Sequence, residues 1–355
     1  MKMRIFFTLL GVAAISLFTT SGTWFSAGSL AYGADKPIAE KNYQELIEGA
    51  QKEGELVVWD TLKGAELKLL DEFKKKYPFL KLKQTLMRSA DATERLIMES
   101  AAGRKPSLDV LALSAKDVDA LKEKALLLSF PWNKVFKVNP VALERDNLAV
   151  AHYSLNSVLA YNTKLLSKDK LPKAYEDLLK PEWKGKIGLD TRGYLWTQLV
   201  ATKNWSEEKG LDFATKMLGQ KPLFQTGGTQ VAQFLAAGQY PLGVTYLDKI
   251  LFFKRKAAPV EWIPLEPVAG FLYGRGIPKE AVHPHAAVLY VGWLATPEGQ
   301  KLLEKYTDKS LPFPDAGTEQ SRLLEGKKLA LVGYGKEAER MDDMETKFMK
   351  IWGAK

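Results

Sequence analysis

The sequence predicts an α/β protein built from open, mainly parallel sheets with helices on their faces. Three apolar stretches are each followed by a helical pattern after a short connection, and they cover residues 55–60, 80–87 and 108–114. Buried strands of a parallel sheet form nearly continuous apolar runs, because helices cover both faces of such a sheet. The alternation of strands and helices therefore favours an open parallel sheet.

Chain length and a change of pattern near residue 148 predict two domains. At 355 residues the chain exceeds the usual size of a single core. Residues 148–161 form one strand-like stretch that is long enough to leave one domain and enter another. Residues 260–268 are extended and punctuated by prolines, and we predict that they are the return crossing. The predicted lobes are residues 35–150 with 266–320, and residues 151–265 with 321–355.

The N-terminus has the layout of a secretory signal peptide. Lys2 and Arg4 precede an apolar run over residues 5–18, and small and polar residues follow it. The run is shorter than a membrane span requires. We predict that residues 1–34 are a signal peptide cleaved near Ala31 or Ala34, and that the mature protein is exported to the periplasm. A retained membrane anchor is the alternative.

Composition and motifs exclude several kinds of chemistry. The chain has no cysteine, which removes disulfides, thiolate catalysis, iron–sulfur clusters and cysteine-based zinc sites. The net charge of +9 is spread over interspersed lysines and acids, unlike a nucleic-acid-binding stripe. No G-x-S-x-G, P-loop or HExxH motif is present. His283 and His285 flank a proline at a predicted helix start, and His152 lies in the first crossing, so we expect structural roles for all three. We predict no cofactor and no metal.

A glycine turn followed by a short helix is the clearest candidate binding element. Residues 226–229 (TGGT) open a helical pattern over residues 230–237, with Thr229 predicted as the N-cap and Gly238 as the stop. A helix N-terminus opened by glycines favours anions, because free N–H groups and the helix dipole point outward. The alternative is an ordinary strand–helix–strand connection.

Two further blocks resemble a known family. Residues 161–164 (YNTK) with 181–187 (PEWKGKI), and residues 293–300 (WLATPEGQ), are similar to the extracellular solute-binding proteins of bacterial ABC importers. The resemblance is strongest to the branch that includes ferric-iron-, thiamine- and aminoethylphosphonate-binding members. It extends in the order of elements from about Glu55 to Tyr306.

The resemblance implies a two-lobed, type II periplasmic-binding fold with a two-crossing hinge and a ligand cleft between the lobes. It also implies a binding protein rather than an enzyme, with a small-molecule ligand and an ABC permease in the inner membrane as partners. We expect a monomer that binds no nucleic acid.

Candidate ligand-binding residues lie at the ends of strands, where open α/β sheets bind ligands, and in tyrosine-bearing stretches. An arginine fork suits a carboxylate or phosphonate, so we predict an anionic or zwitterionic solute. If the solute is zwitterionic, Asp60 or Asp248 would take its ammonium end. The complete predicted set is Asp60, Thr61, Arg88, Ser89, Ser114, Tyr153, Thr191, Arg192, Gly227, Gly228, Thr229, Tyr246, Asp248 and Tyr273.

Ferric iron is the alternative ligand. The resemblance to iron-binding members implies two adjacent tyrosines after the strand that follows the glycine-turn helix, but this chain has Asp248 and Lys249 there, with Tyr246 alone nearby. Fe(III) favours several anionic oxygen ligands, so this difference argues against iron. An exported enzyme on the same scaffold and a ligand-binding partner of a sensor are further alternatives.

Overall fold

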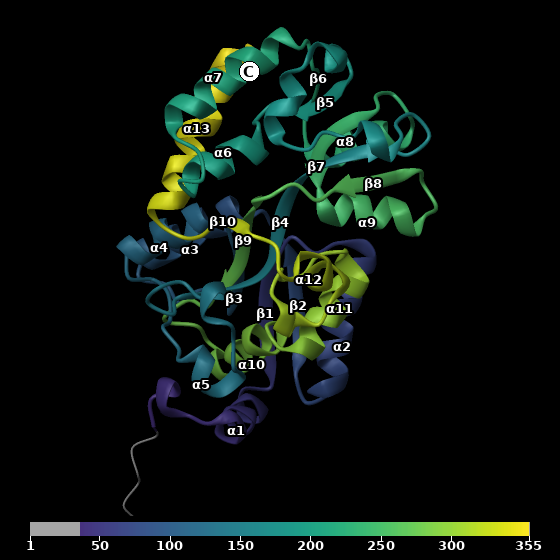
Figure 1. Ribbon diagram of the computed structural model, residues 1–355. Helices are drawn as coiled ribbons and strands as arrows, with labels where there is room; N and C mark the ends of the chain where they lie inside the picture. Colours follow the sequence, from purple (N-terminus) through teal and green to yellow (C-terminus); the bar gives the residue numbers. More distant parts are fainter. Residues whose placement is uncertain (1–35, 355) are drawn as a thin grey trace, which may run out of the picture. The chain divides into compact units, whose positions relative to one another are not determined.

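The computed structural model describes residues 36–354, so the predicted signal peptide and its cleavage sites lie outside the described residues. Strands and helices alternate along the chain (Figure 1). The described strands are β1 (Glu55–Asp60), β2 (Lys81–Leu86), β3 (Val110–Leu113), β4 (Ala149–Asn162), β5 (Ile187–Asp190), β6 (Leu223–Gln225), β7 (Leu242–Tyr246), β8 (Val260–Ile263), β9 (Val268–Gly276) and β10 (Leu329–Val332).

The described α-helices include the long C-terminal helix that the sequence predicts over residues 336–352. In chain order they are α1 (Tyr43–Glu53), α2 (Lys68–Lys76), α3 (Ser89–Ala101), α4 (Ala115–Glu123), α5 (Trp132–Phe136), α6 (Tyr194–Ala201), α7 (Glu207–Gly219), α8 (Gly228–Ala236), α9 (Leu247–Arg255), α10 (Pro284–Leu294), α11 (Pro297–Thr307), α12 (Glu319–Leu324) and α13 (Lys336–Trp352). None of these described helices is long and apolar enough to cross a membrane.

The described strands form one mixed sheet with a parallel group at each end. Its order is β2-β1-β3-β9-β4-β7-β5-β6, with β10 paired to β9 and β8 paired to β4. β1 is parallel to β2 and β3, and β5 is parallel to β6 and β7. β4 and β9 are antiparallel to each other and join the two groups, because β9 pairs with β3 and β4 pairs with β7. These two strands therefore connect the lobes.

The predicted first crossing is confirmed, whereas the predicted return crossing is wrong. β4 covers residues 149–162, but the return is β9 at residues 268–276, and residues 260–263 form a strand beside β4. Glycines weaken the strand signal of β9 in the sequence. Their small size is required in the fold, because a Cβ on Gly274 would lie 2.5 Å from the carbonyl oxygen of Val150.

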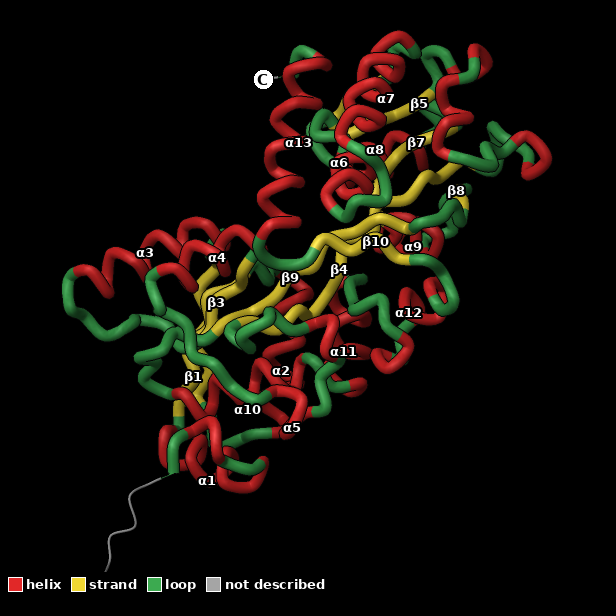
Figure 2. The backbone as a smooth tube through the Cα atoms, turned by 60° about the vertical axis from the view of Figure 1, so that its left-hand side comes forward, coloured by secondary structure: helices red, strands yellow, loops and turns green. Residues whose placement is uncertain are grey.

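Each parallel group of strands packs against its own hydrophobic cluster. One cluster contains Leu56 and Val110 of β1 and β3 with Tyr290 of α10. The other contains Leu189 of β5 with Phe348 and Trp352 of α13. Figure 2 shows α13 beside α6 and α7, while α10 and α11 lie along the other part of the sheet. The residue boundaries of the two lobes remain a prediction.

The N-terminal part of α13 contacts α4, whereas the C-terminal part of α13 packs in the hydrophobic cluster that contains Leu189. The Gly335 N–H donates to Oδ2 of Asp119 at 3.1 Å, and Nζ of Lys116 lies 3.7 Å from Oδ2 of Asp342. The last helix therefore reaches from α4 to the core around β5, across the strands that connect the lobes.

Candidate functional site

One face of the paired strands β4 and β9 carries a row of aromatic and hydroxyl side chains. Successive side chains alternate between the faces of a strand, so Tyr153 and Ser157 share a face with Tyr273 and Phe271. The rings of Tyr153 and Tyr273 stack, with centroids 5.3 Å apart and planes 14° apart. Two of the three predicted ligand-binding tyrosines, Tyr153 and Tyr273, therefore lie together.

The row of rings continues from the sheet onto α6 through Tyr194. The Tyr194 ring centroid is 5.6 Å from that of Phe271 and 6.1 Å from that of Tyr246. Burial raises the pKa of the Tyr194 and Tyr246 hydroxyls. Both hydroxyls are therefore neutral near pH 7, where they serve as hydrogen-bonding groups rather than as charges.

Arg192 is held by a carboxylate from its own loop. Its Nε and Nη2 donate to the two oxygens of Asp190 at 3.0 and 2.9 Å, and its guanidinium carbon lies 4.2 Å from the centroid of the Tyr194 ring. Asp190 ends β5 and is 5% exposed. An arginine has five N–H donors, so the two bonds to Asp190 leave others for a ligand.

The glycine turn lies beside this ion pair. α8 begins at Gly228 with Gly227 as its N-cap, and no side chain caps the helix. The prediction that Thr229 is the N-cap is wrong, because the helix begins at Gly228, two residues before the predicted start, and Thr229 lies in its first turn. A Cβ on Gly227 would lie 3.8 Å from Nη2 of Arg192. The uncapped first turn and the guanidinium are therefore neighbours.

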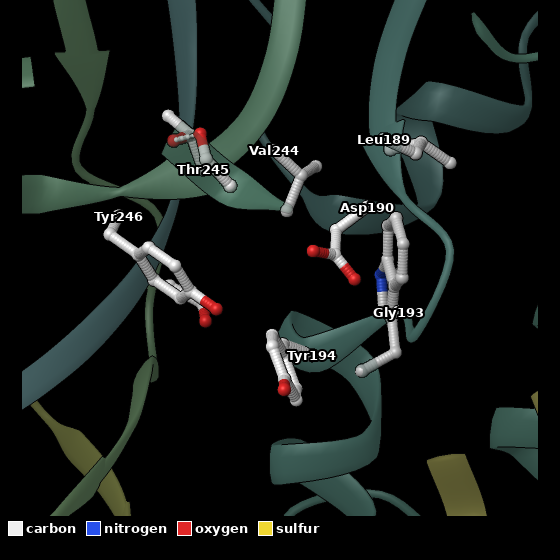
Figure 3. A pocket seen from close by; sticks show the side chains of 10 residues that line it. Leu189, Asp190, Gly193, Tyr194, Val244, Thr245 and Tyr246 are labelled. Carbon is white, nitrogen blue, oxygen red and sulfur yellow. Dashed lines mark hydrogen bonds between the residues drawn. The ribbon is translucent and has the colours of Figure 1, made fainter. Parts of the chain in front are cut away.

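A small cavity lies where Gly228 meets the ring of Tyr246 (Figure 3). A Cβ on Gly228 would come within 2.7 Å of this ring, and the Gly228 carbonyl accepts a hydrogen bond from the Thr245 hydroxyl at 2.6 Å. Asp190 and Tyr194 also line the cavity. Its volume of about 10 Å³ is enough for about one water molecule.

A larger cavity of about 170 Å³ lies on the same side of the strands, under α13. Four parts of the chain line it: the start of α4, α6, the adjacent strands β9 and β10, and α13. The lining residues are Ser114, Ala115, Lys116, Tyr194, Phe271, Leu272, Tyr273, Val332, Ala338, Met341, Asp342 and Glu345. Ser114 and Tyr273 from the predicted set are thus brought to one cavity, although Ser114 also caps α4 through Asp117.

Glu345 is the acidic group of this cavity whose protonation is most strongly altered. Burial, reinforced by the neighbouring charge of Asp342, raises the pKa of Glu345 to about 8. Because the folded chain binds this proton more tightly than the unfolded chain, we expect stability to fall as pH rises between roughly 4.5 and 8 and to level off above that range. Urea unfolding at several pH values should show this slope, and Glu345→Gln should reduce it. An unchanged slope in the variant would contradict the assignment.

Two predicted ligand contacts, Asp60 and Asp248, are buried and paired with other protein groups. Nε of Arg275 donates to Oδ2 of Asp60 at 2.8 Å, and both side chains are at most 3% exposed. Nζ of Lys249 lies 2.9 Å from Oδ2 of Asp248, which is 1% exposed. Neither carboxylate lines the two cavities described above.

Four other predicted residues lie at strand ends, outside the linings of these two cavities. The Arg88 side chain is 83% exposed and forms a bidentate ion pair with Asp91 through two hydrogen bonds. Ser89 is the first residue of α3, and Thr61 is exposed after β1. The Thr191 N–H donates to the Gln225 carbonyl and so joins the loops that follow β5 and β6.

The histidines have the structural roles that the sequence predicts. Nδ1 of His283 lies 2.8 Å from Asp109, and Nδ1 of His285 lies 2.6 Å from Glu53, at the start of α10. His152 is fully buried, with Nε2 2.8 Å from the Val291 carbonyl oxygen. Across residues 36–354 no group of three or more histidine, aspartate or glutamate side chains is placed to hold a metal ion.

Sequence reasoning missed Asp190, Tyr194, Phe271 and Glu345. The position of Asp190 at a strand end, two residues before Arg192, was a usable signal for the pair. Tyr194 and Phe271 had no sequence signal for a site beyond being apolar aromatic residues. Glu345 lies in a charged C-terminal helix, and such a pattern predicts a solvent-exposed helix. The burial of Glu345 results from packing against residues that are distant in the sequence.

Comparison with known proteins agrees with this architecture. Residues 68–317 match the family described as "Bacterial extracellular solute-binding protein". An uncharacterized protein of Haemophilus influenzae is 28% identical over 200 residues, which cover 54% of this chain and 58% of that protein. The match therefore spans little more than half the length of that curated relative.

Solved structures with the same fold include two proteins with different bound ligands. Iron-bound HitA from Pseudomonas aeruginosa has a TM-score of 0.67 and 18% identity, covering 83% of this chain and 99% of HitA. AfuA from Actinobacillus pleuropneumoniae, with fructose-6-phosphate bound, has a TM-score of 0.63 and 24% identity, covering 84% and 97%. The predicted two-lobed, type II periplasmic-binding fold is thereby confirmed. By its sequence match and its fold, the chain belongs to the family of bacterial extracellular solute-binding proteins.

Proposed function

We propose that this protein captures a small anionic or zwitterionic solute between its lobes and delivers it to an ABC permease. The observation that carries the proposal is the uncapped first turn of α8 beside the guanidinium of Arg192. The N–H groups of Gly228 and Thr229 have no acceptor within the helix, and the helix dipole favours negative charge there. The remaining N–H groups of Arg192 add charge-assisted donors from the same wall.

Binding with closure, rather than turnover, is the proposed mechanism. β4 and β9 belong to the strand pairing of both lobes, so a solute that contacts both lobes stabilises the closed arrangement by its differential affinity. In the proposed cycle the permease recognises the closed form. We propose that the mature protein is a periplasmic monomer, produced by cleavage near Ala31 or Ala34.

The pairing of Asp248 with Lys249 supports an organic anion over ferric iron. This carboxylate already has a cation at 2.9 Å in the place where the iron-type tyrosine pair was expected. Tyr246 is buried, and its raised pKa makes a phenolate costly. HitA is described as iron-bound and AfuA as bound to a sugar phosphate, so relatives of this fold hold both kinds of ligand.

Calorimetric titration of the purified protein with phosphates, phosphonates, carboxylates and ferric citrate tests this function. We expect stoichiometric binding of an organic anion that is recovered unchanged. Arg192→Lys should weaken binding by about ten- to a hundredfold, because bonds to a charged group contribute roughly 1.5–3 kcal/mol. Arg88→Ala is the matched control and should bind as the unaltered protein does, since Arg88 is exposed and paired with Asp91.

Three results would contradict the proposal. Equal affinity in the Arg192 variant, with its folding checked by circular dichroism, would remove the anion site. A visible phenolate-to-iron charge-transfer band on adding ferric citrate would establish the iron alternative. Steady formation of product would identify an enzyme.

A further inference from the structure

The cavity of about 170 Å³ under α13 combines aromatic rings with a carboxyl group that has no partner. Phe271 lies between two tyrosines, with its ring centroid 5.6 Å from that of Tyr194 and 5.3 Å from that of Tyr273. All three residues line the cavity, together with Glu345 of α13. The lining therefore combines three aromatic rings with an acid.

Glu345 is available for a ligand because the charged groups around it are committed to one another. Among the described residues its carboxyl group has no hydrogen bond or ion pair, whereas the other acid of the lining, Asp342, lies 3.7 Å from Nζ of Lys116. Arg192, whose charge opposes the rise in the pKa of Glu345, pairs with Asp190 through two of its N–H groups. A half-buried carboxyl without a partner stays mostly protonated near pH 7, and a cationic ligand beside it favours its charged form.

We propose, on the basis of the solute-binding function above, that the solute carries an organic ammonium group and that this group occupies the cavity between Glu345 and the three rings. The negative faces of aromatic rings attract cations, and a nearby carboxylate adds a direct charge pair. The solute is then a zwitterion whose anionic end lies on the first turn of α8. Glu345 and the three rings thus replace Asp60 and Asp248 as the proposed partners of the ammonium end of the solute.

The positions of the two cavities support a single solute that reaches both of them. Tyr194 lines the cavity under α13 and also the small cavity beside Gly228, the first residue of α8. Its ring lies under the guanidinium of Arg192. The ammonium site and the anion site therefore share Tyr194, which suits a two-ended molecule that lies along this side chain.

An organic cation fits this cavity better than the other occupants of similar size. A bare anion would face two acids, and a hard metal ion requires about six oxygen ligands, which the largely aromatic and aliphatic lining lacks. Water would fill the space but would leave the ring faces without a matching partner. The rings and the single free carboxyl together favour an alkylammonium group.

Matched ligand pairs test the proposal directly. Phosphoethanolamine and ethyl phosphate differ by the amine, as do β-alanine and propionate, so calorimetric titration of both pairs isolates its contribution. We expect the amine-bearing member of the bound pair to bind at least about tenfold more tightly. Glu345→Gln should abolish most of this preference while leaving the amine-free member unchanged. Asp343→Asn, an exposed position on the same helix, should retain the preference.

Proton release gives a second, independent measurement. A cation beside Glu345 lowers its pKa from about 8, so binding near pH 7 should expel a proton. Titrations in buffers of different ionisation enthalpy detect this proton, and the Glu345 variant should not release it. The neighbouring groups Asp190, Arg192, Asp342, Lys116, Tyr194 and Tyr273 are unchanged in this variant and provide the common background.

The outcomes separate this inference from the function on which it rests. If the amine-free anions bind as tightly as their amine-bearing partners, or if Glu345→Gln keeps the preference, the ammonium site is overturned and anion capture stands. If neither member of either pair binds but another anion does, the amine-bearing form of that anion must bind more tightly than the amine-free form, and equal affinity overturns the ammonium site. If no anion binds at all, the proposed function and this inference both fail.

Discussion

Replacing Asp60 with asparagine is expected to lower the free energy of unfolding by about 3–5 kcal/mol. The variant removes the charge that compensates Arg275, whose side chain is 3% exposed at the centre of the sheet. An uncompensated charge in this position has lost its hydration without gaining a counter-ion. The effect should therefore be among the largest of any single substitution in the chain.

Urea unfolding followed by circular dichroism measures this loss. Asp91→Asn is the control, because Asp91 pairs with Arg88 at the surface, where solvent screens the two charges and the loss of the pair should change stability little. Similar losses in the two variants would show that Asp60 and Arg275 do not form a buried pair. Near-normal stability of the Asp60 variant would lead to the same conclusion.

Substitution of Gly228 by alanine is expected to impair solute binding and stability together. The new Cβ would meet the Tyr246 ring at 2.7 Å, so either the ring or the first turn of α8 must move. Overpacking of this kind costs about 1–3 kcal/mol. Because the displaced groups form the wall that we assign to the anion, affinity should fall by at least about tenfold.

The neighbouring glycine provides a matched control. A Cβ on Gly227 would have only ordinary contacts, 3.7 Å from Asp190 and 3.8 Å from Arg192, and its φ of 177° is open to any residue. Gly227→Ala should therefore retain nearly normal stability. If the two alanine variants lose the same stability in urea unfolding, contact with Tyr246 is not what requires glycine at position 228.

The extent to which the fold was predictable depended on the length of each pattern. β4 and α13 were located because a long extended run and a long helical run leave few alternatives. β9 was missed because its glycines, which let β4 approach closely, also remove the usual strand signal. For all three elements the local sequence pattern determined the prediction, whereas packing determined the structure.

The candidate site was predictable where strand ends define it and unpredictable where partners are distant in sequence. Ser114, Gly228 and Tyr246 were reached from strand ends and from a turn motif, and they line the cavities. Asp60 looked equally available, but its partner Arg275 lies 215 residues later. Glu345 looked solvated, and only the folded chain places it opposite the rings of Phe271 and its neighbours.

The irregular pairing of β4 with β9 has a mechanical consequence. Their register shifts between Ala151 and Tyr153, and the carbonyl of the intervening His152 accepts a hydrogen bond from the side chain of Gln300. A regular ladder resists torsion through its bonds, whereas a bulge is already released from them. Bending between the lobes should therefore concentrate next to Tyr153, so that the ring that stacks on Tyr273 also lies at the pivot.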